Sequence, residues 1–159
     1  IRAVLWSNRL SLGNYVRIDD FVLISIDSPS IVGNYIHISN SVSIHCSEGF
    51  TMQSFVGLSP GSRLFGESDD FVNGNFMHPS LPRELRLLQR SHITLGSYSQ
   101  VGSNSVLLPG ASLGEGTVVG ALSLLNSESE DWSVYAGIPA KKIGSRKKFD
   151  SSSVKSLET

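Results

Sequence analysis

The chain has 159 residues, of which 40% are hydrophobic, enough for the core of one domain. A net charge of −1 and the lack of a basic, aromatic-rich stretch argue against nucleic-acid binding. No apolar run is long enough to span a bilayer, no secretion signal is visible, and a single cysteine excludes an internal disulfide. We therefore expect a cytoplasmic protein.

An aliphatic residue recurs every six residues along most of the chain. This period is neither helical nor that of a strand, and it is typical of repeats in which three short sides close a triangular coil. Each aliphatic side chain would point to the axis and stack on its equivalent in the next coil. The positions are Leu12, Ile18 and Ile24; Val32, Ile38 and Ile44; Met52, Leu58 and Leu64; Leu95, Val101 and Leu107; Leu113, Val119 and Leu125.

A second inward position lies four residues after each aliphatic and is mostly small or β-branched, as a narrow core requires. Glycine often follows the aliphatic directly, and we expect it there because sharp corners favour a residue without Cβ. The second inward positions are Val16, Val22, Ile36, Val42, Val56, Ser99, Ser105, Ala111, Thr117 and Ser123, and the glycines are Gly13, Gly33, Gly96, Gly102, Gly114 and Gly120. The pattern predicts an all-β solenoid.

The repeat is interrupted at one side of the triangle. Residues 24–31 and 44–51 each carry two extra residues, and the corresponding side of the next coil opens into a long insertion, about residues 65–94. A loop this long in a small domain is usually functional, and its scattered apolar residues favour packing on another surface. We predict a β-helix domain over residues 1–143 with this loop inserted, and a basic, then polar tail over 144–159.

The aliphatic repeat stops after Leu125. Trp132, Val134 and Tyr135 are predicted to cover the open end of the solenoid, before a turn at 137–139. A basic run follows, consisting of Lys141, Lys142, Arg146, Lys147 and Lys148. Such a run is usually a solvated face, but beside a coil end its cations can form charge-assisted hydrogen bonds with phosphates.

The aliphatic repeat, the segment VGALSLL and above all VYAGIPAKKI resemble the C-terminal signature of the hexapeptide-repeat acyltransferases. Within that superfamily, the chain most resembles the galactoside, maltose and xenobiotic O-acetyltransferases and the sugar acetyltransferases of polysaccharide synthesis. The resemblance covers about residues 12–143 and implies a left-handed parallel β-helix with a short C-terminal capping tail. It also implies a homotrimer in which acetyl-CoA lies between neighbouring solenoids.

The activity implied by this resemblance is acetyl transfer from acetyl-CoA to a hydroxyl or amino group of a sugar or sugar nucleotide. The product would enter a surface polysaccharide, such as O-antigen or capsule. Family positions that touch CoA match residues in the last coils and the tail, whose cations would meet the phosphates. They are Ser103, Ala121, Asn126, Ser127, Lys141, Lys142 and Arg146. No metal is expected.

The resemblance also implies a catalytic histidine in the long loop. MHPSLPRELR matches the family's His-Pro element, which indicates His78 as the general base that takes a proton from the attacking group. Related enzymes that share the Asp-Asp-Phe element carry asparagine there, so His37, which should point outward from a flat side, stays as the alternative base. Asp69 and Asp70 are expected either to orient an imidazole or to form a turn.

Two other classes of function remain open. A γ-class carbonic anhydrase uses the same coil to bring three histidines to zinc, but His37 and His45 lack the spacing that would stack ligands on one face. A non-catalytic solenoid would bind no CoA. We expect structural roles for His45, at a corner, and His92, and no nucleophilic role for Cys46, because direct transfer needs no acyl-enzyme.

Overall fold

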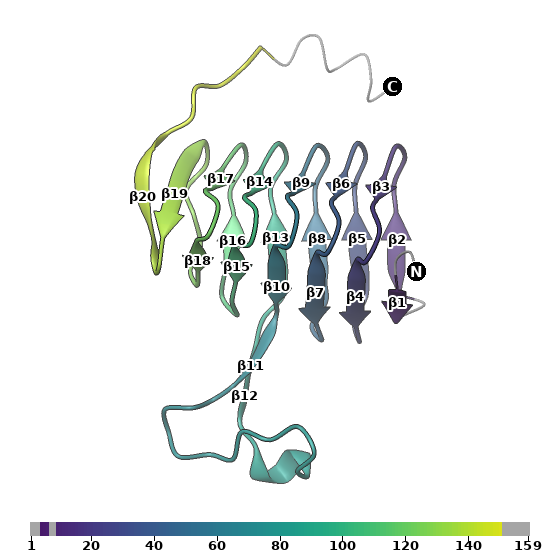
Figure 1. The fold of residues 1–159 in the computed structure, drawn as a ribbon, viewed down its shortest axis with the longest axis vertical. Coiled ribbons are helices and arrows are strands. Elements are labelled where there is room, and N and C mark those ends of the chain that lie inside the picture. Colours follow the sequence, from purple (N-terminus) through teal and green to yellow (C-terminus); the bar gives the residue numbers. More distant parts are fainter. Residues whose placement is uncertain (1–3, 7–8, 151–159) are drawn as a thin grey trace.

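A computed structural model describes residues 4–6 and 9–150 as a solenoid built from three sheets (Figure 1). Sheet A contains β1 (Val4–Trp6), β4 (Leu23–Ile26), β7 (Ser43–Cys46), β10 (Arg63–Phe65), β15 (Val106–Leu107) and β18 (Leu124–Leu125). Sheet B contains β2 (Leu10–Leu12), β5 (Ser30–Val32), β8 (Phe50–Met52), β13 (Ile93–Leu95) and β16 (Ser112–Leu113). Sheet C contains β3 (Arg17–Ile18), β6 (His37–Ile38), β9 (Gly57–Leu58), β14 (Gln100–Val101), β17 (Val118–Val119) and β19 (Ser133–Gly137), with β20 (Ala140–Ser145) antiparallel beside β19.

Parallel, in-register pairing places the predicted aliphatic residues in columns on the axis. Ile24 pairs with Ile44, which pairs with Leu64, and all three are at most 1% exposed. Leu12 differs, at 49% exposure, because the first described coil has a neighbour on one side only. Tyr135, predicted to cover the far end, is buried on β19. The predicted all-β parallel β-helix is confirmed.

The glycines that follow the aliphatic residues do not have the predicted corner conformation. Positive φ angles occur at other glycines and at nine described non-glycine residues, but at none of these six. A Cβ on Gly33 would lie 2.9 Å from the backbone of the next coil, and one on Gly96 would lie 2.7 Å from it. Close approach of successive coils, rather than the corner itself, therefore excludes a side chain.

A stack of aromatic rings occupies the corner between sheets B and C. Tyr15, Tyr35, Phe55 and Tyr98 take the same position in successive coils, with φ between 56° and 65°. Neighbouring ring centroids are 4.6 to 5.0 Å apart. Because the left-handed conformation is costly for residues with a Cβ, ring stacking and corner hydrogen bonds must offset that cost. Gly116 takes the position in the next coil.

The C-terminal segment folds back onto this aromatic stack. Trp132 lies over Gly116, with its ring 6.4 Å from that of Tyr98. Arg146 donates hydrogen bonds to the carbonyl oxygens of Tyr98 (2.8 Å) and Gly116 (3.1 Å), and its guanidinium lies 5.8 Å from the Trp132 ring. Phe149 packs edge-on against both rings. These contacts attach the tail to the solenoid.

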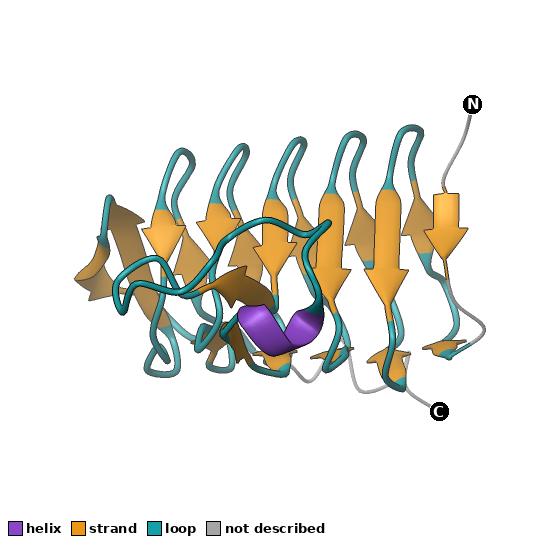
Figure 2. Cartoon of the chain, turned by 90° about the horizontal axis from the view of Figure 1, so that it is seen from below, coloured by secondary structure: helices purple, strands orange, loops and turns teal. Residues whose placement is uncertain are grey.

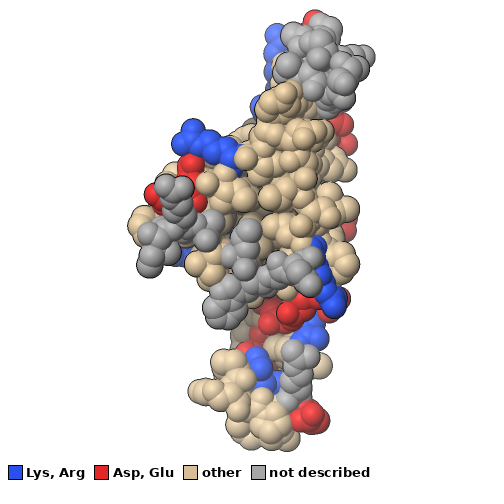
Figure 3. Space-filling model, turned by 90° about the vertical axis from the view of Figure 1, so that its right-hand side faces the viewer, with Lys and Arg blue, Asp and Glu red and all other residues tan. Residues whose placement is uncertain are grey.

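The long insertion leaves the corner between sheets A and B, on the side away from the sheet C strands (Figure 1). Its stalk consists of β11 (Glu67–Asp69) paired antiparallel with β12 (Leu88–Arg90), and a 3-10 turn, η1 (Arg83–Leu85), precedes β12 (Figure 2). Figure 3 shows acidic and basic side chains meeting where the loop joins the solenoid. The ion pair of Glu67 with Arg90 belongs to the stalk. As predicted, the two shorter interruptions fall at the same corner.

Within the described ranges, no helix has the length and apolar character needed to cross a bilayer.

Two buried serines in neighbouring coils provide a test of core energetics. Ser99 Oγ has no hydrogen-bond partner among the described atoms, whereas Ser105 Oγ donates to Gly120 O (2.7 Å) and accepts from Ser123 N (3.2 Å). We expect Ser99→Ala to be at least as stable as the wild type in urea unfolding. Ser105→Ala should lose about 1–3 kcal/mol because it leaves buried backbone groups unpaired. The opposite order of stability would contradict this account of the core.

Candidate functional site

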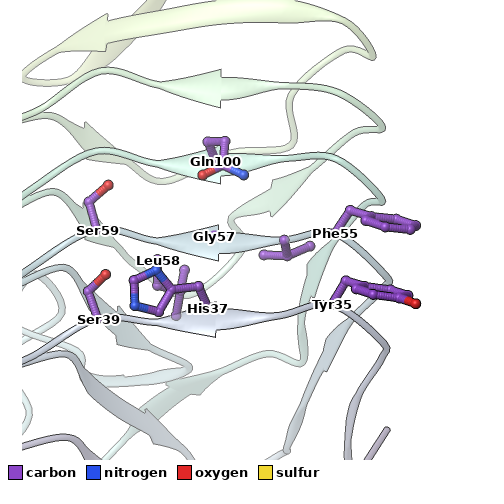
Figure 4. A pocket seen from close by; sticks show the side chains of 9 residues that line it. Tyr35, His37, Ser39, Phe55, Gly57, Leu58, Ser59 and Gln100 are labelled. Carbon is purple, nitrogen blue, oxygen red and sulfur yellow. The ribbon is translucent and has the colours of Figure 1, made fainter. Parts of the chain in front are cut away.

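The outer face of sheet C carries an open pocket of about 240 Å³. It spans β6, β9 and β14, and Figure 4 shows its side chains. The hollow lies at Gly57, which pairs in register with His37 on one side and Gln100 on the other. The lining residues are Tyr35, His37, Ser39, Phe55, Val56, Gly57, Leu58, Ser59 and Gln100.

His37 lies at the edge of this pocket and points outward, as the repeat predicts. Ile38, the next residue, points into the core at 0% exposure, so strand alternation places the imidazole on the outer face. The His37 side chain is 46% exposed. Of the two histidines predicted as general base, this one lies in the pocket.

An aspartate one coil away fixes the orientation of this imidazole. His37 Nε2 lies 2.8 Å from Asp19 Oδ2, and Arg17 Nε donates to Asp19 Oδ1 at 2.7 Å. The hydrogen bond from His37, followed by that from Arg17, lowers the pKa of the Asp19 carboxyl, which is therefore ionised at neutral pH. A carboxylate on Nε2 holds the proton there and leaves Nδ1 as an acceptor. Nδ1 has no partner within the described part of the chain.

Asp19 was not identified from the sequence. Asp19 follows Ile18 as Ser39 follows Ile38, so the register pairs Arg17 with His37 and leaves Asp19 diagonal to His37 in the preceding coil. The sequence contained one signal for Asp19: it follows a core isoleucine of the repeat, at the position that Ser39 takes in the next coil. Gln100 and Ser59 were missed for the same reason, because each becomes part of the pocket only when the coils stack.

His78 lies elsewhere, on the exposed part of the long loop. Its Nδ1 accepts a hydrogen bond from the Ser80 backbone N–H at 3.3 Å. The loop leaves the corner opposite sheet C, so the imidazole is not part of the pocket of its own chain (Figure 1). The predicted role of His78 as general base stays a prediction.

The aspartates predicted as orienters or turn formers organise the loop. Asp69 forms a two-bond ion pair with Arg86 at 2.9 and 3.0 Å. Asp70 is 2% exposed and accepts bonds from the Asn73 side chain, the Val72 backbone and the Asn75 side chain. The bond from the Asn73 side chain contributes most to lowering the pKa of Asp70. Of the two predicted alternatives, Asp70 therefore forms a turn, and within the described ranges neither carboxylate bonds to a histidine.

The remaining histidines and the cysteine make structural contacts. His45 lies within β7, not at the predicted corner, and stacks on Phe65 at 5.5 Å. His92 bonds to the Thr51 hydroxyl at 2.9 Å and to the backbone carbonyl of Glu48 at 3.0 Å. Burial raises the pKa of the Cys46 thiol to about 12, which leaves it a poor nucleophile. Within the described ranges, no three His, Cys, Asp or Glu residues are grouped as metal ligands.

Part of the predicted CoA set lies along one edge of the solenoid. Ser103 and Ala121 follow sheet C strands in successive coils, and the Leu122 backbone N–H donates to Ser103 O at 2.9 Å. In the next coil Ala136 takes the position of Gly120, one residue before Ala121, and it pairs in register with Lys141 on β20. Ser39 and Ser59 of the pocket lie on the same edge, in earlier coils. Ser103 and Ala121 thus lie beyond the end of the pocket, along the edge that Ser39 and Ser59 begin, and their predicted contact with CoA stays a prediction.

Other members of the predicted CoA set lie apart or already have partners. Asn126 and Ser127 follow β18 at the corner between sheets A and B and are exposed. Lys142 pairs with Glu130 at 2.7 Å, and Arg146 is held by the two carbonyl oxygens described above. Lys141 is the predicted cation that is exposed and has no ion-pair partner in the described part of the chain.

Comparisons with known proteins agree with this architecture. No family model matches the chain. It is 34% identical over 143 residues to dTDP-4-amino-4,6-dideoxy-D-glucose acyltransferase of Escherichia coli, covering 89% of this chain and 74% of that protein. It is 30% identical over 118 residues to the lipopolysaccharide biosynthesis O-acetyl transferase WbbJ of Escherichia coli strain K12, covering 70% of this chain and 55% of that protein.

A solved acyltransferase structure is also similar to this chain. AntD, an N-acyltransferase from Bacillus cereus in complex with dTDP and 3-hydroxybutyryl-CoA, superimposes with a TM-score of 0.92. The two chains are 29% identical, and the superposition covers 99% of this chain and 86% of that chain. Together with the identity to the Escherichia coli enzyme over most of both chains, this confirms the resemblance predicted from the repeat. The chain belongs to the hexapeptide-repeat acyltransferases.

Proposed function

We propose that the protein transfers an acyl group from a CoA thioester to the amino group of a nucleotide-linked amino sugar. The observation that carries this proposal is the single edge that joins the pocket beside His37 to Ser103, Ala121 and Lys141. The Escherichia coli relative is named for a dTDP-linked amino sugar, and AntD binds dTDP together with 3-hydroxybutyryl-CoA. The acyl group therefore includes chains longer than the acetyl expected from sequence.

One residue of a two-residue pattern supports placing the sugar at the pocket, and the other residue lies on the loop stalk. Structures of AntD variants replace a serine and an aspartate that lie ten residues apart, and one holds dTDP-4-amino-4,6-dideoxyglucose with CoA. In this chain, Ser59 and Asp69 are the serine and aspartate with this spacing and order. Ser59 lines the pocket, and Asp69 ends the first strand of the loop stalk.

His37 supplies the base in this proposal. The amine lone pair attacks the thioester carbonyl, and His37 Nδ1 takes the proton as the C–N bond forms. Asp19 stabilises the resulting imidazolium through its bond to Nε2. When the carbonyl re-forms and the C–S bond breaks, the imidazolium returns the proton to the departing CoA thiolate. His78 could serve this pocket only from the loop of a neighbouring copy.

The predicted homotrimer is part of the proposal. Apolar side chains near the end of the loop are largely exposed, at 74% for Phe71, 76% for Val72, 62% for Phe76 and 55% for Met77. A surface of this kind favours burial against another chain. A trimer would place the loop of one copy near the solenoid of the next. The similarity to a lipopolysaccharide biosynthesis transferase supports the predicted role in surface polysaccharide synthesis, and the cytoplasmic location stays a prediction.

Histidine variants test the reaction. Release of CoA thiol should be observed when wild-type protein, acetyl-CoA or 3-hydroxybutyryl-CoA and dTDP-4-amino-4,6-dideoxyglucose are combined. His37→Asn should lower kcat by about 10²–10⁴-fold because the base is lost, with CoA affinity unchanged. His78→Asn is the matched control. A large loss only in His78→Asn would move the base to the loop, and a wild type inactive on every amino sugar nucleotide would refute the proposal.

Two basic residues of the tail are expected to behave differently. Lys141→Ala should weaken CoA binding about tenfold in calorimetry, because one charge-assisted bond to a phosphate is lost, without lowering Tm. Arg146→Ala should lower Tm, because it releases the tail from Tyr98 and Gly116. If Arg146→Ala kept its Tm and lost CoA affinity instead, Arg146 would be the phosphate ligand.

A further inference from the structure

We infer that Gly57 determines which acceptors the enzyme takes, because a side chain there would push the Gln100 amide into the space for the sugar ring beside His37. This inference rests on the proposed function and extends it to the acceptor's shape. Gly57 belongs to an outward column of sheet C that receives one residue from each coil. The column contains Arg17, His37, Gly57, Gln100, Val118 and Val134. Within these described coils, Gly57 is the position without a side chain.

The fold itself does not require glycine at this position. Gly57 has no positive φ angle, so its backbone conformation is open to any residue. A Cβ there would overlap the terminal amide of Gln100, which is the far end of a flexible side chain. Gly96 is different, because its Cβ would meet backbone atoms of the next coil. A side chain at residue 57 would therefore displace Gln100 without moving the coils.

Glycine at this position also costs stability. A glycine inside a strand loses more conformational entropy on folding than other residues, and it adds nothing to side-chain packing. Valine is a preferred strand residue, and Val118 and Val134 occupy the same column in later coils. The column thus accepts valine, whereas at Gly57 the place of a side chain is taken by the flexible terminal amide of Gln100.

The surroundings of the hollow fit one face of a deoxy-pyranose. The hydroxyls of Ser39 and Ser59 lie toward one end of the pocket, and the rings of Tyr35 and Phe55 lie toward the other (Figure 4). The Gln100 amide faces His37 across Gly57 (Figure 4). Hydroxyls and an amide bind the polar groups of a sugar, whereas aromatic carbon suits its methyl group and ring hydrogens. The hollow therefore takes the acceptor sugar and not the nucleotide.

Gly57→Val separates the functional role from a structural one. We expect its Tm to equal or exceed that of the wild type, its KM for the amino sugar nucleotide to rise at least tenfold, and its Kd for CoA to stay the same. Gly57→Ala should show a smaller rise in KM. Gly144→Ala is the control for a glycine outside the pocket, since a Cβ there would meet nothing within 4 Å.

Calorimetry with the sugar nucleotide alone gives a readout independent of turnover. Gly57→Val should weaken this binding by the same factor as it raises KM. Unchanged binding and KM in an otherwise active enzyme would overturn the inference about Gly57 and leave the proposed function intact. A fall in Tm would assign the glycine to folding and would also overturn it. Inactivity of the wild type on all amino sugar nucleotides would instead overturn the proposed function.

Discussion

The in-register pairing of each strand with the strand one coil away is the constraint on which the rest of the structure depends. It stacks Val32, Met52 and Leu95 inside the solenoid, and it places His37, Gly57 and Gln100 in one outward column. Buried and exposed columns alternate because successive residues of a strand face opposite sides. Core and site are therefore built by the same backbone hydrogen bonds, and a substitution acts mainly within its own column.

Much of the solenoid could be predicted from the sequence because the repeat carries the packing information. If the sequence lacked an aliphatic residue at one of the repeat positions, the axial column would contain a gap. Every predicted aliphatic residue between Ile24 and Leu125 is buried in the core. The role of glycine could not be predicted, because the distance between coils at Gly33 is a tertiary property. The internal fold of the loop likewise depends on contacts such as the ion pair of Asp69 with Arg86, which no repeat encodes.

The candidate site was less predictable because it requires residues from three coils at once. An outward His37 followed from alternation, but its bond to Asp19 joins residues 18 positions apart. A basic run suggested phosphate binding for Arg146, whereas the structure uses its guanidinium to hold the tail against carbonyl oxygens and the Trp132 ring. The roles of Asp19 and Arg146 depend on residues that are distant in the sequence and adjacent only in the folded chain. The buried aliphatic columns hold the solenoid together. The candidate site lies in the outward column of sheet C, where the residue type changes from coil to coil.

The central claim is that acyl transfer occurs on the outer face of sheet C, beside His37. The most direct measurement is a crystal structure with CoA and dTDP-4-amino-4,6-dideoxyglucose bound together. Our account predicts the acceptor nitrogen within hydrogen-bond distance of His37 Nδ1, the sugar ring beside the Gln100 amide, and the CoA along the edge that carries Ser103 and Ala121. A sugar bound against the loop with its nitrogen at His78, and with the sheet C pocket empty, would contradict it.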